Sequence, residues 1–339
     1  MRPLQLRETL GAMIQAREPV LIKGAPGIGK TDIVTQACED VGTELIVAHP
    51  VVDDPTDYKG FPHVTGPKGN QQADFLPFGN LRRIVEATES TVFFLDDLGQ
   101  APPSVQAAAM QLILARHVNE HAVSDQVVFL AATNRKEDRA GVSGILEPVK
   151  SRFTTIVELE PNVDDWSRWA GANDMPAELI AFVNFRPNLL YAFAPSADIT
   201  NSPCPRTVAA VGRILKLNVG SGLRMELIGG AAGDGFAAEL EGFLRIYEQN
   251  LPDPKEVLQH PDDFDIGAIC TSPDISYALI AALADHVEKK TMAAFVSVCN
   301  RVQPEYSVMG MRLAHMRTPA LLETREFSEW ARDHQDVFI

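Results

Sequence analysis

The sequence predicts an α/β domain with a mostly parallel sheet, followed by a helical domain that begins near residue 160. Up to Pro161, short apolar runs alternate with segments in which apolar residues recur at helical spacing. Strands separated by helices form parallel sheets with both faces covered. After Pro161 the apolar runs stop, and helical patterns continue to Ile339. A chain of 339 residues is long enough for two such domains.

The first domain, residues 1–160, is predicted to alternate helices with strands. Its opening helix is indicated by Leu6, Leu10 and Ile14, which lie four residues apart, and by Pro19, which follows. The expected helices are Leu4–Ala16, Thr31–Gly42, Leu81–Ala87 and Ser104–Arg116. The expected strands are Pro19–Gly24, Thr43–Ala48, Thr91–Asp96, Gln126–Thr133 and Thr154–Glu160.

The second domain, residues 161–339, is predicted to be an all-helical lid with further C-terminal helices. The acidic stretch His260–Asp265 lacks the alternating oxygen ligands and the glycine of an EF-hand calcium loop, so we expect a solvated loop there. The expected helices are Asp164–Gly171, Pro176–Phe185, Arg206–Leu217, Phe236–Gln249 and Ile275–Glu288.

Composition restricts the function classes. The formal net charge is −15 and the pI is about 5.0, a balance that disfavours binding to nucleic acid or to an anionic membrane. The four cysteines form no Cys-x-x-Cys pair and are predicted to be small buried side chains in a reducing cytoplasm. We expect a cytoplasmic protein, because no apolar run is long enough to cross a bilayer and the N-terminal residues do not resemble a signal peptide.

The most specific motif is GAPGIGKT, which lies between a predicted strand and a predicted helix. In this setting the pattern G-x-x-x-x-G-K-[ST] predicts a loop whose backbone N–H groups surround phosphates at the positive end of a helix. A glycine-rich turn with a chance Lys-Thr pair is the alternative, and it does not account for the flanking strand and helix. The predicted fold class is therefore the P-loop NTPase αβα sandwich with a parallel sheet. The predicted nucleotide-binding residues are Gly24, Ala25, Pro26, Gly27, Ile28, Gly29, Lys30 and Thr31.

Two carboxylates, Asp96 and Asp97, end the apolar strand that begins at Thr91. Ligands bind at the carboxyl edge of open α/β sheets, so Asp96 is predicted to hold Mg²⁺ together with the hydroxyl of Thr31. Asp97 is predicted to orient and deprotonate the attacking water, a position that glutamate takes in many ATPases. Asp is one methylene shorter than Glu, which would slow hydrolysis without abolishing it. The alternative is that both acids are only solvated.

Three further polar residues are candidates for the site. Asn134 ends the next strand and is predicted to bind the γ-phosphate or the lytic water, unless it is only a turn residue. Arg152 precedes the last strand, where it would either stabilise transition-state charge in a neighbouring subunit or pair with a surface acid. Arg206 follows Pro205 in the first turn of a helix, where an anionic ligand would offset the unfavourable helix dipole.

Taken together, these motifs resemble those of the AAA+ ATPases, and within them the MoxR-like group. GAPGIGKT is similar to Walker A, FFLDDLGQAPPSVQAAAMQLI to Walker B with the following helix, FLAATNR to sensor 1, VKSRF to the arginine-finger segment and SPCPRTV to sensor 2. The resemblance covers residues 20–210 and implies an ATPase that uses Mg²⁺. It implies catalytic roles for Asp97, for Asn134 as sensor 1 and for Arg152 as a finger acting in trans, with Arg206 as sensor 2. It also implies a homo-oligomeric ring, a hexamer, and a protein partner such as one with a von Willebrand factor A domain.

A polar, Gly/Pro-rich stretch, Asp53–Asn80, forms most of an insert at about residues 50–80. Structureless loops of this length are uncommon in compact domains. The resemblance implies that the insert projects toward a central pore, where Tyr58, Lys59 and Phe61 would grip a partner. The alternative is that the aromatic side chains pack onto their own domain. Residues 115–124 are a candidate second pore-facing hairpin, and its histidines are not predicted to bind metal.

Three functions stay open at this point. The first is a ring-forming ATPase that remodels or activates a partner protein, as a chaperone does. The second is a nucleic-acid-directed NTPase, against which the acidic charge balance and the lack of a basic stripe argue. The third is a nucleotide-gated assembly scaffold with weak hydrolysis, which Asp97 in place of Glu would favour.

Overall fold

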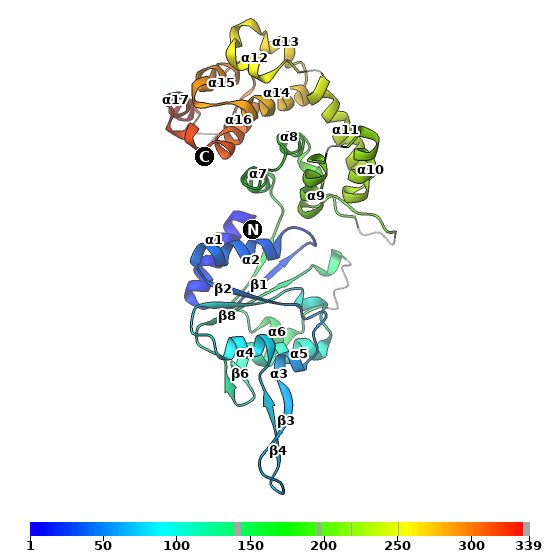
Figure 1. Cartoon of the computed structure of the whole chain (residues 1–339), viewed down its shortest axis with the longest axis vertical. Helices are drawn as coiled ribbons and strands as arrows, with labels where there is room; N and C mark the ends of the chain where they lie inside the picture. The colour runs from blue at the N-terminus through cyan, green and yellow to red at the C-terminus, as the bar shows by residue number, and fades with distance from the viewer. Residues whose placement is uncertain (139–143, 195–197, 218, 250, 335–339) are drawn as a thin grey trace. The chain divides into compact units, whose positions relative to one another are not determined.

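The computed structural model describes residues 1–138, 144–194, 198–217, 219–249 and 251–334 (Figure 1). The chain divides into two compact units, Met1–Pro161 and Asn162–Ile339, here called unit 1 and unit 2. Unit 1 is built on a parallel sheet with helices on both faces, and the described part of unit 2 is helical. The predicted fold class, an αβα sandwich of the P-loop NTPase type followed by a helical region, is confirmed.

The sheet of unit 1 has five parallel strands in the order β2-β5-β8-β1-β9. Every residue of β5 and β8 is buried, as expected for central strands of a sheet covered on both faces. Because β8 lies between β5 and β1, the carboxyl ends of these three strands are neighbours at one edge. The strands are β1 (Val20–Gly24), β2 (Glu44–Ala48), β5 (Thr91–Leu95), β8 (Val127–Thr133) and β9 (Thr155–Leu159).

Helices cover both faces of this sheet (Figure 1). On one face lie α1 (Pro3–Ala16) and α2 (Lys30–Val41), and on the other α4 (Gly79–Val85), α5 (Pro103–Ala115) and α6 (Glu147–Lys150). The core on the α5 side includes Phe93 and Phe129, whose rings meet edge to face with centroids 6.0 Å apart. Two 3₁₀ turns, η1 (Leu98–Gln100) and η2 (Lys136–Asp138), follow β5 and β8.

The insert is not a structureless loop. It contains α3 (Thr56–Lys59) and an antiparallel hairpin of β3 (Phe61–Thr65) and β4 (Gln72–Leu76), here called the arm. Figure 1 shows the arm extending away from the body of unit 1. The predicted hairpin at residues 115–124 is confirmed as β6 (His117–Val118) and β7 (His121–Ala122).

Unit 2 packs its helices around α14, in which every residue from Ala278 to Ala284 is buried. The five predicted helices correspond to α7 (Val163–Ala172), α8 (Ala177–Phe185), α9 (Pro205–Leu215), α11 (Asp234–Gln249) and α14 (Pro273–His286). Six more were not predicted: α10 (Ser221–Ala232), α12 (Pro254–Gln259), α13 (Ile266–Ile269), α15 (Met292–Cys299), α16 (Pro304–Arg317) and α17 (Arg325–Asp333). The 3₁₀ turns are η3 (Pro187–Leu189), η4 (Pro261–Asp263), η5 (Lys289–Thr291) and η6 (Pro319–Glu323). None of the described helices combines the length and apolar character needed to span a membrane.

Candidate nucleotide-binding site

The loop Gly24–Thr31 joins the end of β1 to the start of α2. Gly29, the N-cap of α2, has φ 95°, a conformation that side-chain-bearing residues rarely adopt. It gives α2 no side-chain cap, so the N–H groups of the first turn are not occupied from this position. The loop therefore presents backbone donors and the positive end of a helix dipole to an anion.

Lys30 is the one charged residue of this loop, and only 7% of its surface is exposed. Its Nζ donates to the carbonyl oxygens of Gly24 and Ala25, each at 3.0 Å, and to Oδ1 of Asn134 at 2.6 Å. These contacts hold the ammonium group directly over the loop. The positive charge is therefore already close to the place where phosphate oxygens would bind, and the lysine side chain would lose little conformational freedom on binding them.

Thr31 and Asp96 come together across the loop. The Thr31 hydroxyl donates to Oδ2 of Asp96 at 2.7 Å. Asp96 is fixed in turn by its backbone N–H, which donates to the Ala48 carbonyl oxygen at 3.0 Å and so extends the β5–β2 pairing. A hydroxyl and a carboxylate oxygen at this distance are hard ligands of the kind that Mg²⁺ prefers.

Asp97 lies at the turn after β5 in a left-handed conformation, with φ 57°. Its Oδ1 accepts a hydrogen bond from Nδ2 of Asn134 at 3.3 Å. Asn134 follows β8, which runs between the strands that carry Asp97 and the phosphate loop. One buried amide, 8% exposed, therefore links the carboxylate of Asp97 to the ammonium group of Lys30.

These contacts bring the predicted residues into one cluster. Asp96 and Asp97 each accept a hydrogen bond from another residue of the cluster. Both ends of the Asn134 amide are engaged, one with Lys30 and the other with Asp97.

Gly99 is a residue of this region that the sequence did not single out. A Cβ atom at this position would lie 2.1 Å from Oγ1 of Thr133 and 3.3 Å from Cγ1 of Ile145. The turn after Asp97 thus packs directly on the end of β8, and only glycine permits that approach. The signal was the glycine two residues after Asp97, which a sequence pattern alone does not separate from an ordinary turn glycine.

Neither candidate arginine has a side-chain partner within the described residues. Arg152, just after α6, is half-buried, and its Nε is buried with no hydrogen-bond partner. The surface ion pair considered as an alternative is therefore not found among those residues. Arg206 is exposed as the second residue of α9 in unit 2.

The aromatic residues of the insert differ in burial: Tyr58 packs on its own unit, whereas Phe61 is exposed. Tyr58 is 2% exposed, and its hydroxyl donates to Oδ2 of Asp53 at 2.5 Å. Burial and this hydrogen bond raise the pKa of Tyr58 well above its usual value. The side chain of Tyr58 therefore packs on its own unit, which was the stated alternative to contact with a partner. Lys59 is exposed, and Phe61 is 61% exposed against the edge of Phe78.

Tyr58→Phe is expected to lower the free energy of unfolding by about 1.5–3 kcal/mol, because a buried hydrogen bond to a carboxylate is lost. Urea denaturation followed by circular dichroism measures this, since all three tryptophans lie in unit 2 and would not report on unit 1. Phe61→Ala is the control and should leave the midpoint unchanged. Equal stability of Tyr58→Phe and the native chain would contradict the assigned contact.

All four cysteines are free, and Cys38, Cys204 and Cys299 are buried. Burial raises the pKa of the Cys38 and Cys299 thiols to about 12, so these are unreactive core side chains. Among the described residues, no group of three His, Cys, Asp or Glu side chains is placed to hold a metal ion. The oxygen pair of Thr31 and Asp96 instead suits an ion that takes most of its ligands from phosphate and water.

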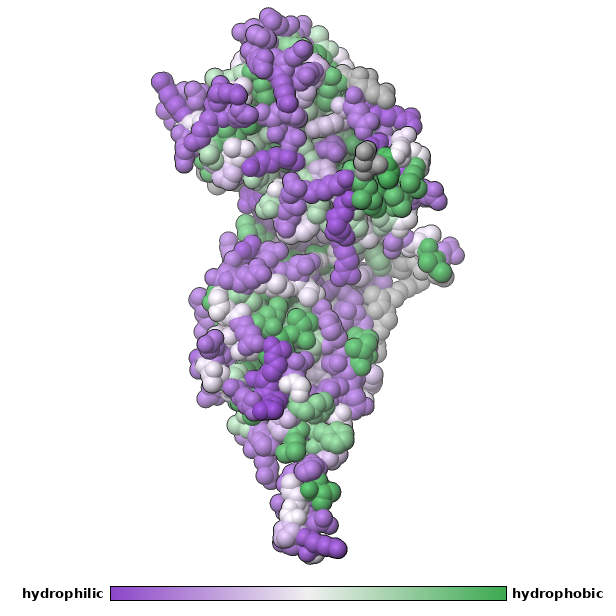
Figure 2. All heavy atoms as spheres, in the orientation of Figure 1, coloured by the Kyte–Doolittle hydropathy of each residue, from purple (hydrophilic) through white to green (hydrophobic). Residues whose placement is uncertain are grey.

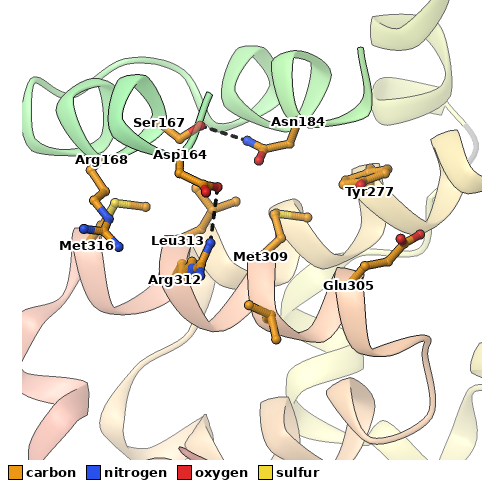
Figure 3. Close-up of a pocket in the computed structure, with 11 residues that line it drawn as sticks. Asp164, Ser167, Arg168, Asn184, Tyr277, Glu305, Met309, Arg312, Leu313 and Met316 are labelled. Atoms are coloured by element: carbon orange, nitrogen blue, oxygen red, sulfur yellow. Dashed lines mark hydrogen bonds and ion pairs between the residues drawn. The ribbon is translucent and has the colours of Figure 1, made fainter. Parts of the chain in front are cut away.

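Unit 2 contains a pocket of about 260 Å³ between α7 and α16. Figure 3 shows its two internal pairs, Asp164 with Arg312 (O–N 3.2 Å) and Asn184 with Ser167 (N–O 3.0 Å). Its lining combines both signs of charge with methionine and leucine side chains, so it favours no one class of ligand. The residues that line it are Asp164, Ser167, Arg168, Asn184, Tyr277, Glu305, Val308, Met309, Arg312, Leu313 and Met316.

Comparison with known proteins identifies the domain that carries the site. Residues 19–153 match the AAA domain of the dynein-related subfamily. No curated protein sequence matches the chain.

Similar solved structures include the RuvB Holliday junction branch migration motor of Thermotoga maritima. The two chains share 16% sequence identity and a TM-score of 0.42, over 90% of this chain and 86% of that chain. A protein of Cytophaga hutchinsonii proposed to be an ATPase shares 14% identity and a TM-score of 0.35, over 98% of this chain and 88% of that chain. The match over residues 19–153, together with the phosphate loop and its acidic partners, shows that the chain carries an AAA domain and is an ATP hydrolase.

Proposed function

We propose that the chain is a MoxR-like ATPase that assembles as a hexameric ring and uses hydrolysis to remodel or activate a partner protein. The observation that carries this proposal is Arg152. The guanidinium group of Arg152, whose Nε has no hydrogen-bond partner, lies one residue before the end of the matched AAA domain and is suited to be the charge that one subunit supplies to another.

Within one subunit, the proposed division of work follows the contacts. The amides of Gly24–Thr31 and the Lys30 ammonium group bind the phosphates. Thr31 and Asp96 would hold Mg²⁺, which when bound neutralises charge on the outer phosphates. Asp97 orients and deprotonates the attacking water, and Asn134 fixes the carboxylate that does so. Arg206 is proposed to bind nucleotide as sensor 2, on the sequence resemblance alone.

A ring follows from the finger role proposed for Arg152. Within the described residues no carboxylate pairs with the Arg152 guanidinium group, so its charge is available to a phosphate of a neighbouring subunit's nucleotide. In this arrangement each subunit completes the site of the next, so hydrolysis depends on assembly.

The exposed apolar side chains of the arm support the proposal that the chain binds another protein. Strands β3 and β4, together with Phe78 just after them, expose five large apolar side chains. Exposed apolar residues that are scattered singly are normal at protein surfaces, whereas a group of five is not. Figure 2 shows hydrophobic residues gathered where the arm leaves the body of unit 1. These side chains are Phe61, Val64, Phe75, Leu76 and Phe78, between 38% and 61% exposed. A von Willebrand factor A domain protein is the partner that the MoxR-like resemblance suggests.

The proposal is tested by measuring ATP hydrolysis over a range of protein concentrations, with molecular mass determined with and without Mg·ATP. Specific activity is expected to rise as the oligomer forms, because Arg152 of one subunit acts in the site of another. Activity that is independent of concentration while the mass changes would contradict a shared site. Assembly with ATP but without turnover would favour a nucleotide-gated scaffold over a remodelling machine.

The nucleic-acid reading is tested in the same assay by adding single-stranded or double-stranded DNA. No stimulation is expected, because the chain has a net charge of −15 and the arm carries one lysine, Lys68, beside one aspartate, Asp74. A strong stimulation that weakens steeply with salt would instead favour a nucleic-acid-directed NTPase.

A further inference from the structure

Gln106 is a completely buried amide on α5, with 0% of its surface exposed. Both ends of the amide are used. Its Nε2 donates to the carbonyl oxygens of Ala101 at 3.1 Å and Gly144 at 3.0 Å, and its Oε1 accepts from the N–H of Leu146 at 3.1 Å. The side chain thereby joins two backbone segments that lie more than forty residues apart in the sequence.

The first of these segments is the turn that begins at Asp97. The N–H of Gln100 donates to the Asp97 carbonyl oxygen at 2.9 Å, and the N–H of Ala101 donates to the Leu98 carbonyl oxygen at 3.2 Å. Ala101, which Gln106 holds, therefore ends the turn that sets the backbone of Asp97. A shift of this turn would move the carbonyl oxygen to which Gln106 donates.

The second segment leads to Arg152. Leu146 is the N-cap of α6, and its carbonyl oxygen accepts from the N–H of Val149 at 2.9 Å. The N–H of Arg152 then donates to the Val149 carbonyl oxygen at 3.1 Å. Val149 is completely buried, so this turn is anchored to the core as well as to Gln106.

Direct packing joins the two segments at Gly99. The space of a Cβ at Gly99 is filled by Thr133, the residue before Asn134, and by Ile145, the residue before Leu146. The turn after Asp97, the end of β8 and the residues that start α6 therefore touch one another, and Gln106 fastens them with hydrogen bonds. Close-packed contacts of this kind transmit small displacements.

We infer that Gln106 is a positioning residue that couples the turn of Asp97 to the turn of Arg152. The state of a subunit's own site thereby sets the position of the arginine that it presents to its neighbour. This inference rests on the proposed shared site. No other side chain of similar size supplies two donors and one acceptor here: glutamate would bring a charge against two carbonyl oxygens, and methionine would leave three backbone groups without partners.

Gln106→Met tests the coupling, with Gln111→Met as its control because Gln111 is exposed on the same helix. The Gln106 variant is expected to bind ATP within about twofold of the native affinity, yet to hydrolyse it about 10- to 100-fold more slowly, as misplacement of a catalytic group by an ångström does. Gln111→Met should do neither. Native turnover by a folded Gln106→Met protein would overturn the inference.

Mixed oligomers separate a positioning role from a local defect. Gln106→Met is expected to recover activity with Asp97→Asn, which lacks a working site but presents an intact Arg152. It is expected to recover none with Arg152→Ala, because both then lack a working finger. The opposite pattern would show that Gln106 acts on its own Asp97 and would overturn the inference.

Mixing Arg152→Ala with Asp97→Asn is the reference for these experiments. Recovery in that mixture establishes shared sites whatever Gln106 does. If oligomers shown to contain both variants recover no activity, the proposed shared site is refuted, and the inference about Gln106 is refuted with it. If only the Gln106 mixtures fail to recover, the inference alone is overturned.

A measurement on the native chain covers the case in which Gln106→Met does not fold. Amide hydrogen exchange of residues 144–153 is compared with ADP and with a non-hydrolysable ATP analogue, below the concentration at which the chain assembles. Exchange at Leu146 and Val149 is expected to differ severalfold between the two nucleotides. Identical exchange would overturn the coupling.

Discussion

Lys30→Ala is expected to weaken ATP binding by about 100-fold, the largest effect on affinity of any single change in the phosphate loop. The estimate follows from the charge-assisted hydrogen bonds that the ammonium group would make to the phosphates, each worth about 1.5–3 kcal/mol, less the contacts within the site that it exchanges for them. Lys30 is already held over the loop by the carbonyl oxygens of Gly24 and Ala25 and by Asn134, so little conformational entropy is lost when phosphate binds.

Titration with a fluorescent ATP analogue measures this affinity. Lys23→Ala is the matched control, because Lys23 lies on β1 just before the phosphate loop and pairs with Glu158 at 3.3 Å on the half-exposed surface. The control should bind ATP with native affinity. Circular dichroism must show that the Lys30 variant is folded, since its removal leaves three acceptors without a donor. Tight ATP binding by a folded Lys30→Ala protein would refute the assignment of the phosphate loop.

The parallel sheet could be predicted because its strands are continuous apolar runs separated by helical patterns. The residues Thr91–Leu95 and Val127–Thr133 are buried without exception, so neither strand has the alternation that would confuse the prediction. The glycine loop between a strand and a helix then placed phosphate binding at one edge of the sheet. Both signals are local in sequence, which is why they could be read without a structure.

The arm was missed for the opposite reason. Its strands contain Pro62 and several polar residues, and four of the five residues of each strand are exposed. No buried face imposed an apolar alternation on them, so the pattern predicted only a long insert. Tyr58 shows a related limit, since nothing in the sequence separates an aromatic side chain that packs inward from one that faces a partner.

At the site, the sequence predicted which residues lie close together but not which hydrogen bonds they form. Asp96, Asp97 and Asn134 were placed at strand ends, and parallel strands bring such ends to one edge. The amide of Asn134 bridges Lys30 and Asp97 because β8 lies between their two strands, and strand order is a tertiary property. The role of Gln106 could not be predicted for the same reason, because its three backbone partners lie in segments that only the fold brings together.

Arg152→Ala is expected to leave ATP binding unchanged and to reduce turnover by about 10³-fold or more, the range found when a finger arginine is removed from a nucleotide hydrolase. Binding should persist because none of the contacts around Lys30, Thr31 and Asp96 involves Arg152. Turnover should fall because the guanidinium stabilises charge that develops only in the transition state. The effect is therefore expected on kcat, with the ATP affinity as the internal reference.

Lys150→Ala provides the control for loss of a positive charge at the same place. Lys150 lies on α6 two residues before Arg152 but is paired with Glu147 at 2.5 Å, whereas Nε of Arg152 is buried and has no partner. If an unsatisfied guanidinium is the functional feature, Lys150→Ala keeps native turnover and Arg152→Ala loses it. Oligomers of Arg152→Ala should still form with Mg·ATP, since the loss concerns charge in the transition state. Equal turnover of the two variants would remove the finger role, and with it the reason for expecting hydrolysis to depend on assembly.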